Sequence, residues 1–128
     1  MTFIKVRFRK NILLLIILLI ISSCDVFDTH KHITGHYYII NDKFGKALCY
    51  QVNTNGDCIR IISGGFGAIG FDEHYIIVRV DNYDYRIIPI YQNTYSPEKG
   101  ILGPLSLNEF NKQKNILKIK AKFSINTN

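Results

Sequence analysis

The chain has 128 residues, with 16 Lys or Arg against 10 Asp or Glu and a formal net charge of +6 at pH 7. Residues 1–23 hold four of the basic residues and none of the acidic ones, so 12 basic and 10 acidic residues remain beyond them, a net charge of +2. So small a charge gives no case for nucleic acid as a partner. The length suits one small domain with a modest core.

Residues 1–23 have the pattern of an export signal. Lys5, Arg7, Arg9 and Lys10 form a positive segment, and Ile12–Ile21 is an unbroken apolar run. A membrane-spanning helix needs about 20 predominantly apolar residues, so this run is too short to span. A basic segment followed by a short apolar run is instead typical of a signal peptide.

The apolar run ends in Ile21-Ser22-Ser23-Cys24, which resembles the lipobox of bacterial lipoproteins. The resemblance implies that the chain is cut before Cys24, that this thiol receives a diacylglycerol, and that the new amino terminus is acylated. Several acyl chains together anchor firmly, because each buried CH₂ contributes roughly 0.8 kcal/mol. The alternative is an ordinary secretory signal followed by an accidental cysteine. The expected location is the bacterial cell membrane, inner or outer, with the domain on the extracytoplasmic side.

Residues 24–34 are short, polar and without periodicity, which predicts a tether ahead of a single domain at 35–128. His30, His32 and His36 lie close together in this part of the chain, and imidazole is a common metal ligand. No carboxylate or thiolate spacing completes a ligand set, so we expect no metal and no cofactor.

From His36 onward the sequence predicts antiparallel β-structure. Short runs rich in β-branched and aromatic residues alternate with polar turns, at 37–40, 47–52, 58–63, 75–80 and 85–90. The glycine-rich segment Ser63–Gly67 follows the third run. It lacks both the GxGxxG pattern and the Walker lysine, and a strand rather than a helix is expected behind it. It therefore predicts a turn or bulge, with a phosphate cradle as the alternative.

Apart from the lipobox cysteine, the chain contains Cys49 and Cys58. Strand alternation places both thiols on one side of a predicted hairpin, in a compartment where a disulfide persists. The two lie directly opposite only if the turn is centred on residues 53–54, whereas a turn at 55–56 sets Cys49 against Ile62. The pattern leaves two outcomes open, a Cys49–Cys58 disulfide or two free thiols.

The C-terminal part carries the clearest local signal. Ser106 and Glu109 have the spacing of a capping box, and Leu105 with Phe110 forms the matching hydrophobic staple, so a helix is predicted over 107–115. At 117–123 apolar residues alternate with lysine, which predicts a final strand with a charged outer face. The alternative is that this basic stripe, Lys118, Lys120 and Lys122, lies against anionic lipid headgroups. The fold class is thus α+β, mainly an antiparallel sheet of about six to seven short strands with one C-terminal helix.

Much of the chain beyond the signal resembles an uncharacterised group of small bacterial lipoproteins, the domain of unknown function 3997. The resemblance rests on four segments: Gly35–Tyr38, Gly70–Val78, Tyr85–Ile90, and Gly103–Ser106 with Glu109–Phe110. It implies a bacterial envelope protein and brings no catalytic or binding residues.

Asp72, Glu73 and His74 are the compact cluster of acids and imidazole in the expected domain, and they are the candidate surface site. Neighbours on an extended chain point to opposite faces, which argues against joint catalysis. We therefore expect no catalytic residues and a monomeric, non-catalytic binding module, immunity- or inhibitor-like, with an envelope protein as its partner. The alternative is a small envelope hydrolase acting on cell wall or glycan, drawing on this cluster and Asp84.

Overall fold

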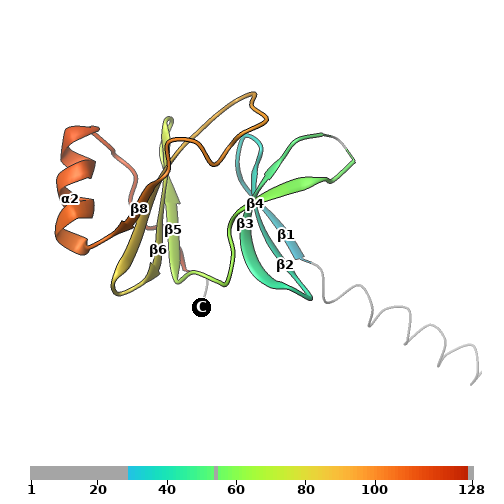
Figure 1. The fold of residues 1–128 in the computed structure, drawn as a ribbon, viewed down its shortest axis with the longest axis horizontal. Helices are drawn as coiled ribbons and strands as arrows, with labels where there is room; N and C mark the ends of the chain where they lie inside the picture. Colours follow the sequence, from blue (N-terminus) through green and yellow to red (C-terminus); the bar gives the residue numbers. More distant parts are fainter. Residues whose placement is uncertain (1–28, 54, 127–128) are drawn as a thin grey trace, which may run out of the picture.

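The computed structural model describes residues 29–53 and 55–126. Two antiparallel sheets pack face to face, and one helix covers the outer face of the second sheet (Figure 1). The export signal and Cys24 lie outside the described residues. No helix within those residues has the length and apolar character needed to cross a bilayer.

The first sheet is a meander of four strands in the order β1-β2-β3-β4. Its strands are β1 (Thr29–Thr34), β2 (Tyr37–Asp42), β3 (Gly45–Gln51) and β4 (Cys58–Ile62). The second sheet has five strands in the order β8-β7-β6-β5-β9. Its strands are β5 (Ala68–Phe71), β6 (Tyr75–Asp81), β7 (Asp84–Pro89), β8 (Leu102–Leu105) and β9 (Ile125–Asn126), and helix α2 (Leu107–Ile116) follows β8.

The α+β class with one C-terminal helix is confirmed, but the predicted number of strands is too low. Residues 29–34, expected to belong to the tether, form β1 and pair with β2. This edge strand buries Ile33 and leaves His30, Lys31 and His32 exposed, so its sequence lacks an apolar alternation. Strand β8 contains Gly103 and Pro104, residues that ordinarily argue against a strand and are tolerated at a sheet edge.

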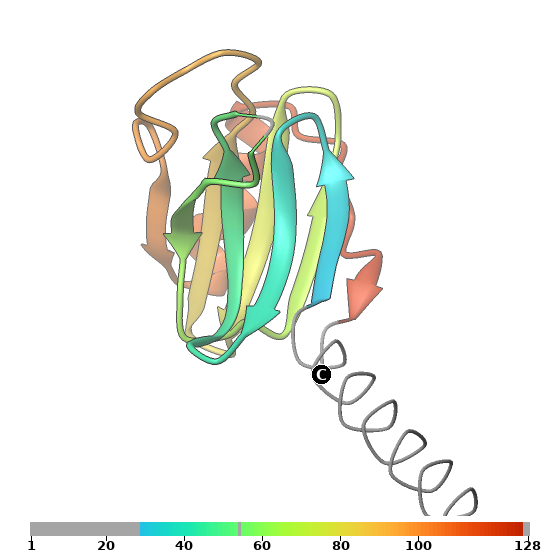
Figure 2. The ribbon, with the colours of Figure 1, turned by 90° about the vertical axis from the view of Figure 1, so that its right-hand side faces the viewer.

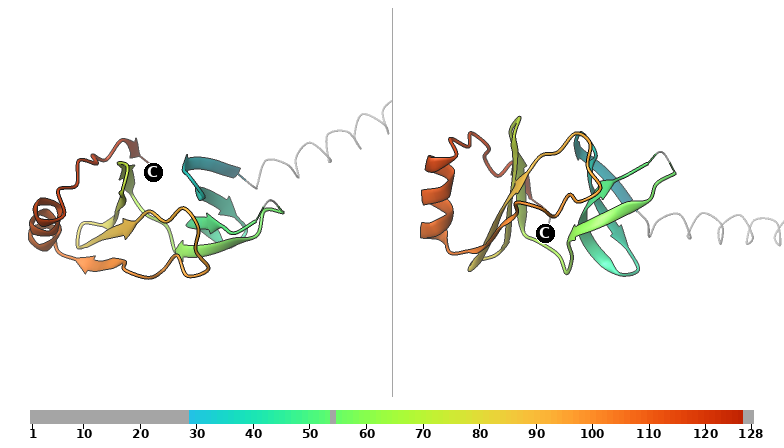
Figure 3. Two further views of the ribbon diagram at one scale, coloured as in Figure 1. Left: turned by 90° about the horizontal axis from the view of Figure 1, so that it is seen from above. Right: turned by 45° about the horizontal axis from the view of Figure 1, so that its top comes forward.

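The largest apolar cluster lies between the two sheets and draws side chains from both. Its buried members are Ile33, Tyr37, Ile39, Leu48, Tyr50, Ile62, Phe66, Ile69, Ile76, Val78 and Ile88. A second cluster fills the space between the second sheet and α2, where the Tyr85 and Phe110 rings stack with centroids 4.9 Å apart. The molecule therefore has three layers, sheet, sheet and helix (Figure 3).

Helix α2 begins as predicted. The Ser106 hydroxyl accepts a hydrogen bond from the Glu109 N–H at 3.2 Å, and the Glu109 carboxylate accepts one from the Ser106 N–H at 3.3 Å, which confirms the capping box. Leu105 packs against the cluster that contains Phe110, as the staple requires. Leu107, in the first turn of the helix, is 50% exposed.

The predicted final strand at 117–123 is wrong. Side chains alternate as expected as far as Lys122, with Ala121 buried and Lys120 and Lys122 exposed, but Phe123 is 38% exposed and the segment pairs with no neighbouring strand. The segment instead crosses β5 in close contact with Gly70. A Cβ on Gly70 would lie 2.0 Å from the Lys122 carbonyl oxygen. An extended segment that packs one side on the sheet shows the same period of two as a hydrogen-bonded strand. Within the C-terminal segment, β9 is the part that pairs with β5.

Strand registers give the domain two distinct ends. Thr29 pairs with Asn41 beside the β2–β3 turn, and the Gly67 N–H bonds the Arg79 carbonyl beside the β6–β7 turn. The N-proximal end therefore comprises the start of β1, the β2–β3 turn, the linker 63–67 and the β6–β7 turn (Figure 2). The distal end comprises the β1–β2 turn, the β3–β4 loop, the β5–β6 turn and the loop 90–101.

Candidate functional site

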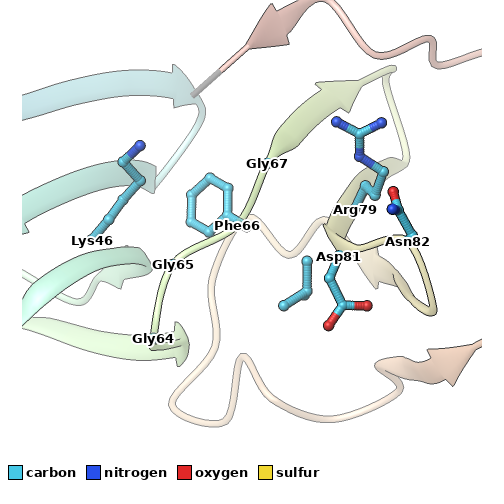
Figure 4. A pocket seen from close by; sticks show the side chains of 9 residues that line it. Lys46, Gly64, Gly65, Phe66, Gly67, Arg79, Asp81 and Asn82 are labelled. Atoms are coloured by element: carbon cyan, nitrogen blue, oxygen red, sulfur yellow. The ribbon is translucent and has the colours of Figure 1, made fainter. Parts of the chain in front are cut away.

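A pocket of about 580 Å³ opens at the N-proximal end, between the two sheets. It is lined by three segments that are distant in sequence: Lys46 at the start of β3, the linker Gly64–Gly67, and Arg79–Asn82 at the end of β6 and in the following turn. Figure 4 shows Lys46 on the side of the first sheet, Arg79 on the side of the second, and Phe66 between them.

The glycine-rich linker is fixed to both sheets. The Gly65 N–H donates to the Lys46 carbonyl at 3.2 Å, and the Gly67 N–H donates to the Arg79 carbonyl at 2.8 Å. Gly64 and Gly65 have φ values of 88° and 90°, a conformation that side chains disfavour. Phe66, which follows Gly65, turns into the core and is buried. The predicted turn is thus an ordered connection whose backbone forms the floor of the pocket.

The pocket walls carry more positive than negative charge. The Arg79 guanidinium lies over the linker, since a Cβ on Gly67 would be 3.3 Å from one of its nitrogens. Lys46 supplies the second cation and Asp81 the one carboxylate of the lining residues. One oxygen of Asp81 accepts the Tyr83 N–H at 2.7 Å. Lys46 and Arg79 can attract an anionic group such as a phosphate by their charge, whereas the Gly65 and Gly67 N–H groups are already bonded to carbonyls.

An exposed aromatic side chain stands on each side of the pocket, at the tip of a hairpin. Phe44 in the β2–β3 turn is 71% exposed, and Tyr83 in the β6–β7 turn is 87% exposed. Each tip is held in the same way, because an aspartate two residues earlier accepts the aromatic residue's N–H: Asp42 for Phe44 at 2.8 Å and Asp81 for Tyr83. The aromatic rings are therefore presented outward on rigid turns.

Two ion pairs support these turns. Arg60 donates to both carboxylate oxygens of Asp42, at 2.7 and 2.5 Å, and Arg86 donates to both of Asp84, at 2.8 and 2.9 Å. The hydrogen bond from Arg60, followed by that from the Phe44 N–H, lowers the pKa of Asp42. The hydrogen bonds that Arg86 donates to Asp84 raise the pKa of Arg86. Asp42 therefore stays ionised at neutral pH, and the two ion pairs hold both turns.

The candidate cluster Asp72, Glu73 and His74 lies at the distal end, in the β5–β6 turn. One oxygen of Asp72 accepts the N–H groups of His74 and Tyr75 at 2.8 Å, and the other accepts the Lys120 N–H at 2.9 Å. Burial acts to raise the pKa of this carboxyl, but backbone N–H donors, His74 and Lys120 foremost, outweigh it and lower the pKa. The Asp72 carboxylate thus holds the C-terminal segment in place.

The structure does not bring Asp72 and Asp84 together. Asp72 lies at the distal end, whereas Asp84 begins β7 at the N-proximal end and is paired with Arg86. Glu73 and His74 are exposed beside Asp72. The residues named for a hydrolase therefore do not form one pocket among the described residues.

The structure does not bring the three histidines into a shared metal site, and two of them bond backbone carbonyls. His32 bonds the Gly35 carbonyl at 2.9 Å, and His36 bonds the Gln51 carbonyl at 3.1 Å. No group of three His, Cys, Asp or Glu side chains able to hold a metal occurs in the described part of the chain.

Cys49 and Cys58 are joined by a disulfide in the structure, with their Cα atoms 5.6 Å apart. Neither register considered from the sequence is the one observed. Cys58 pairs with Gln51 and Cys49 with Arg60, so the two cysteines are diagonal neighbours on the outer face of the first sheet. Oxidation of the two thiols in the cell stays a prediction.

Sequence reasoning identified the linker but missed Lys46 and Arg79. The pairing of β3 and β6 with their neighbouring strands brings these two residues beside the linker, and no local sequence pattern predicts that pairing. Comparison with known proteins adds no assignment: no family model, no curated protein and no solved structure matches the chain. The resemblance to the domain of unknown function 3997 stays a prediction.

Proposed function

We propose that this protein is a non-catalytic binding module, held at the bacterial envelope by lipid on Cys24. The separation of the candidate catalytic groups carries the proposal. Asp72 and Asp84 lie at opposite ends, and each carboxylate is committed to a structural bond, Asp72 to backbone N–H groups and Asp84 to Arg86. A hydrolase would need two such groups within reach of one substrate bond.

The distal end supplies a surface for an envelope protein partner. The loop 90–101 is ordered there, since the Tyr91 hydroxyl donates to the Lys99 carbonyl at 2.7 Å and Pro97 is buried. Tyr95 projects from this loop and is 91% exposed. Tyrosine is enriched at protein interfaces, and an ordered loop binds with less loss of conformational entropy.

The anchor and the partner surface need separate tests. Growth with a radiolabelled fatty acid should label the wild-type protein and leave the Cys24→Ala variant unlabelled. Crosslinking in intact cells should then recover a specific partner that is lost with Tyr95→Ala and retained with Ile116→Ala, a change at an exposed apolar position on α2. Absence of label, or release of wall fragments by the purified protein, would contradict the proposal.

A further inference from the structure

We infer that the N-proximal end is a membrane-docking surface whose pocket receives the phosphate of an anionic lipid headgroup. The inference rests on the proposed lipid anchor at Cys24. It adds a defined orientation of the domain and a second contact with the bilayer.

The first step is the length of chain between the anchor and the domain. Cys24 precedes Thr29, the first residue of β1, by five positions. A fully extended residue spans at most about 3.6 Å, so Thr29 lies within roughly 18 Å of a lipidated Cys24. Thr29 belongs to the same end of the domain as the pocket and both aromatic tips. The anchor therefore keeps this end beside the headgroups.

The second step is the chemistry of the two tips. Aromatic rings favour the boundary between headgroups and acyl chains. Phe44 and Tyr83 are both strongly exposed there, on turns whose backbone is fixed by Asp42 and Asp81. Lys43 lies over the Phe44 ring, its Nζ atom 5.1 Å from the ring centroid. A ring with a cation beside it can enter the interface while the charge stays at headgroup level.

The third step is the distribution of charge. The hairpins and strand ends that make up the N-proximal end carry five basic and three acidic side chains: Lys43, Lys46, Arg60, Arg79, Arg86, Asp42, Asp81 and Asp84. Glu109, in the adjoining first turn of α2, adds a fourth acid. The distal loops carry four acidic side chains, Asp57, Asp72, Glu73 and Glu98, against Lys99, with Lys118 and Lys120 on the adjoining segment. The basic end is thus the one that the anchor holds near an anionic surface.

Screening does not remove this attraction. The Debye length is about 8 Å at physiological ionic strength, shorter than the extended tether. The tether however permits direct contact, and an anchored domain meets the surface at a high effective concentration. Contact brings the basic residues of this end, Lys43 and Arg79 among them, within a Debye length of the headgroup charges.

The same geometry argues against the basic stripe as the docking surface. The segment with Lys118, Lys120 and Lys122 starts at the distal end, where the Lys120 N–H bonds Asp72, and runs along the second sheet toward β9. A membrane that faces the N-proximal end cannot contact its whole length. Lys118 and Lys120 therefore serve as control positions.

The experiment uses the absence of tryptophan from the chain. Tyr83→Trp and Phe44→Trp each place one indole at the N-proximal end, and Tyr95→Trp places one at the distal end, all at exposed positions. The full lipidated proteins are reconstituted in vesicles of brominated phosphatidylcholine, with or without phosphatidylglycerol. We expect severalfold stronger quenching at positions 83 and 44 than at 95 in vesicles containing phosphatidylglycerol, and a blue shift at 83 and 44.

Charge reversal tests the pocket side. Lys43→Glu with Lys46→Glu, made in the Tyr83→Trp background, should reduce quenching at least twofold, whereas Lys118→Glu with Lys120→Glu should leave it unchanged.

Equal quenching at 83 and 95 in protein that carries the fatty acid label would overturn the docking surface and leave the anchor intact. Inorganic phosphate added at constant ionic strength should compete with the headgroup and reduce quenching at position 83. Quenching unchanged by phosphate would overturn the role of the pocket. Unlabelled protein that stays off the vesicles would overturn the anchor itself, and with it the docking that depends on it.

Discussion

Tyr37 in the first sheet and Pro89 in the second are joined by a hydrogen bond. The Tyr37 hydroxyl donates to the Pro89 carbonyl at 3.1 Å and accepts the Tyr91 N–H at 3.0 Å. The ring is fully buried between the sheets, and this burial raises the pKa of the phenol. One side chain thus ties the first sheet to the loop 90–101, which carries the proposed partner surface.

Tyr37→Phe should weaken this tie without disturbing the core. The ring stays packed, while the Tyr91 N–H and the Pro89 carbonyl lose their partner, which we expect to cost about 1–3 kcal/mol of unfolding free energy. Urea denaturation measures the loss. Tyr83→Phe, which changes an exposed hydroxyl, should stay within about 0.5 kcal/mol of wild type. Equal stability of both variants would mean that the hydroxyl contributes nothing to joining the sheets.

Asp72 should make stability depend on pH in the acid range. Its folded pKa lies below its unfolded value, so the stabilisation is complete above about pH 4, the unfolded value, and is lost as pH falls through the folded pKa. Asp72→Ala should cost about 1.5–3 kcal/mol at neutral pH and flatten this part of the profile. Glu73→Gln, an exposed neighbour, should leave the profile unchanged. Thermal unfolding between pH 2 and pH 7 provides the comparison, and an unaltered acid transition in Asp72→Ala would contradict it.

Gly70 should tolerate no side chain. A Cβ there would lie 2.0 Å from the Lys122 carbonyl oxygen, so Gly70→Ala must displace the segment that crosses β5, at a cost of about 1–3 kcal/mol. Gly67→Ala is the matched control, because its Cβ would meet the mobile Arg79 guanidinium at 3.3 Å. Hydrogen exchange should show faster exchange of the Ser124 amide, which bonds the Ile69 carbonyl, in the first variant only. The same exchange rate of the Ser124 amide in both variants would contradict a close contact between Gly70 and the Lys122 backbone.

The Cys49–Cys58 disulfide should stabilise the first sheet. The cysteines are nine residues apart, and closing a loop of this size in the unfolded chain contributes roughly 2–3 kcal/mol. Reducing agent should lower the denaturation midpoint of the wild type and leave a Cys49→Ala, Cys58→Ala double variant unaffected. Non-reducing mass spectrometry of protein isolated from the envelope is the direct check. Two free thiols in that protein would contradict the prediction.

Local signals predicted the fold best. The capping box of Ser106 and Glu109 lies within four residues, so the start of α2 was readable directly. Strand β1 was not readable, because an edge strand needs backbone partners more than apolar side chains. The segment 117–123 showed a strand-like period because one side packs on the sheet, although it has no ladder partner.

The site shows the same limit. The linker glycines are visible in the sequence, but Lys46 and Arg79 reach them only through the pairing of strands separated by other elements. Tertiary register, not local pattern, decides which cations share the pocket. Asp72 illustrates the converse. Its neighbours Glu73 and His74 suggested a functional site, but the hydrogen bond from the Lys120 N–H shows that this carboxylate has a structural role.

The order of the layers along the chain has a consequence for the export that we propose. Residues 29–62 build the whole first sheet and residues 68–126 the second, and the linker 63–67 joins them. A chain exported amino terminus first releases a complete four-stranded sheet whose inner face, with Leu48 and Ile62, is still bare. Such a half has nothing to bury that face until the second sheet emerges. Cleavage within the linker before that moment should leave two fragments that aggregate unless they meet, whereas both halves supplied together should reassemble.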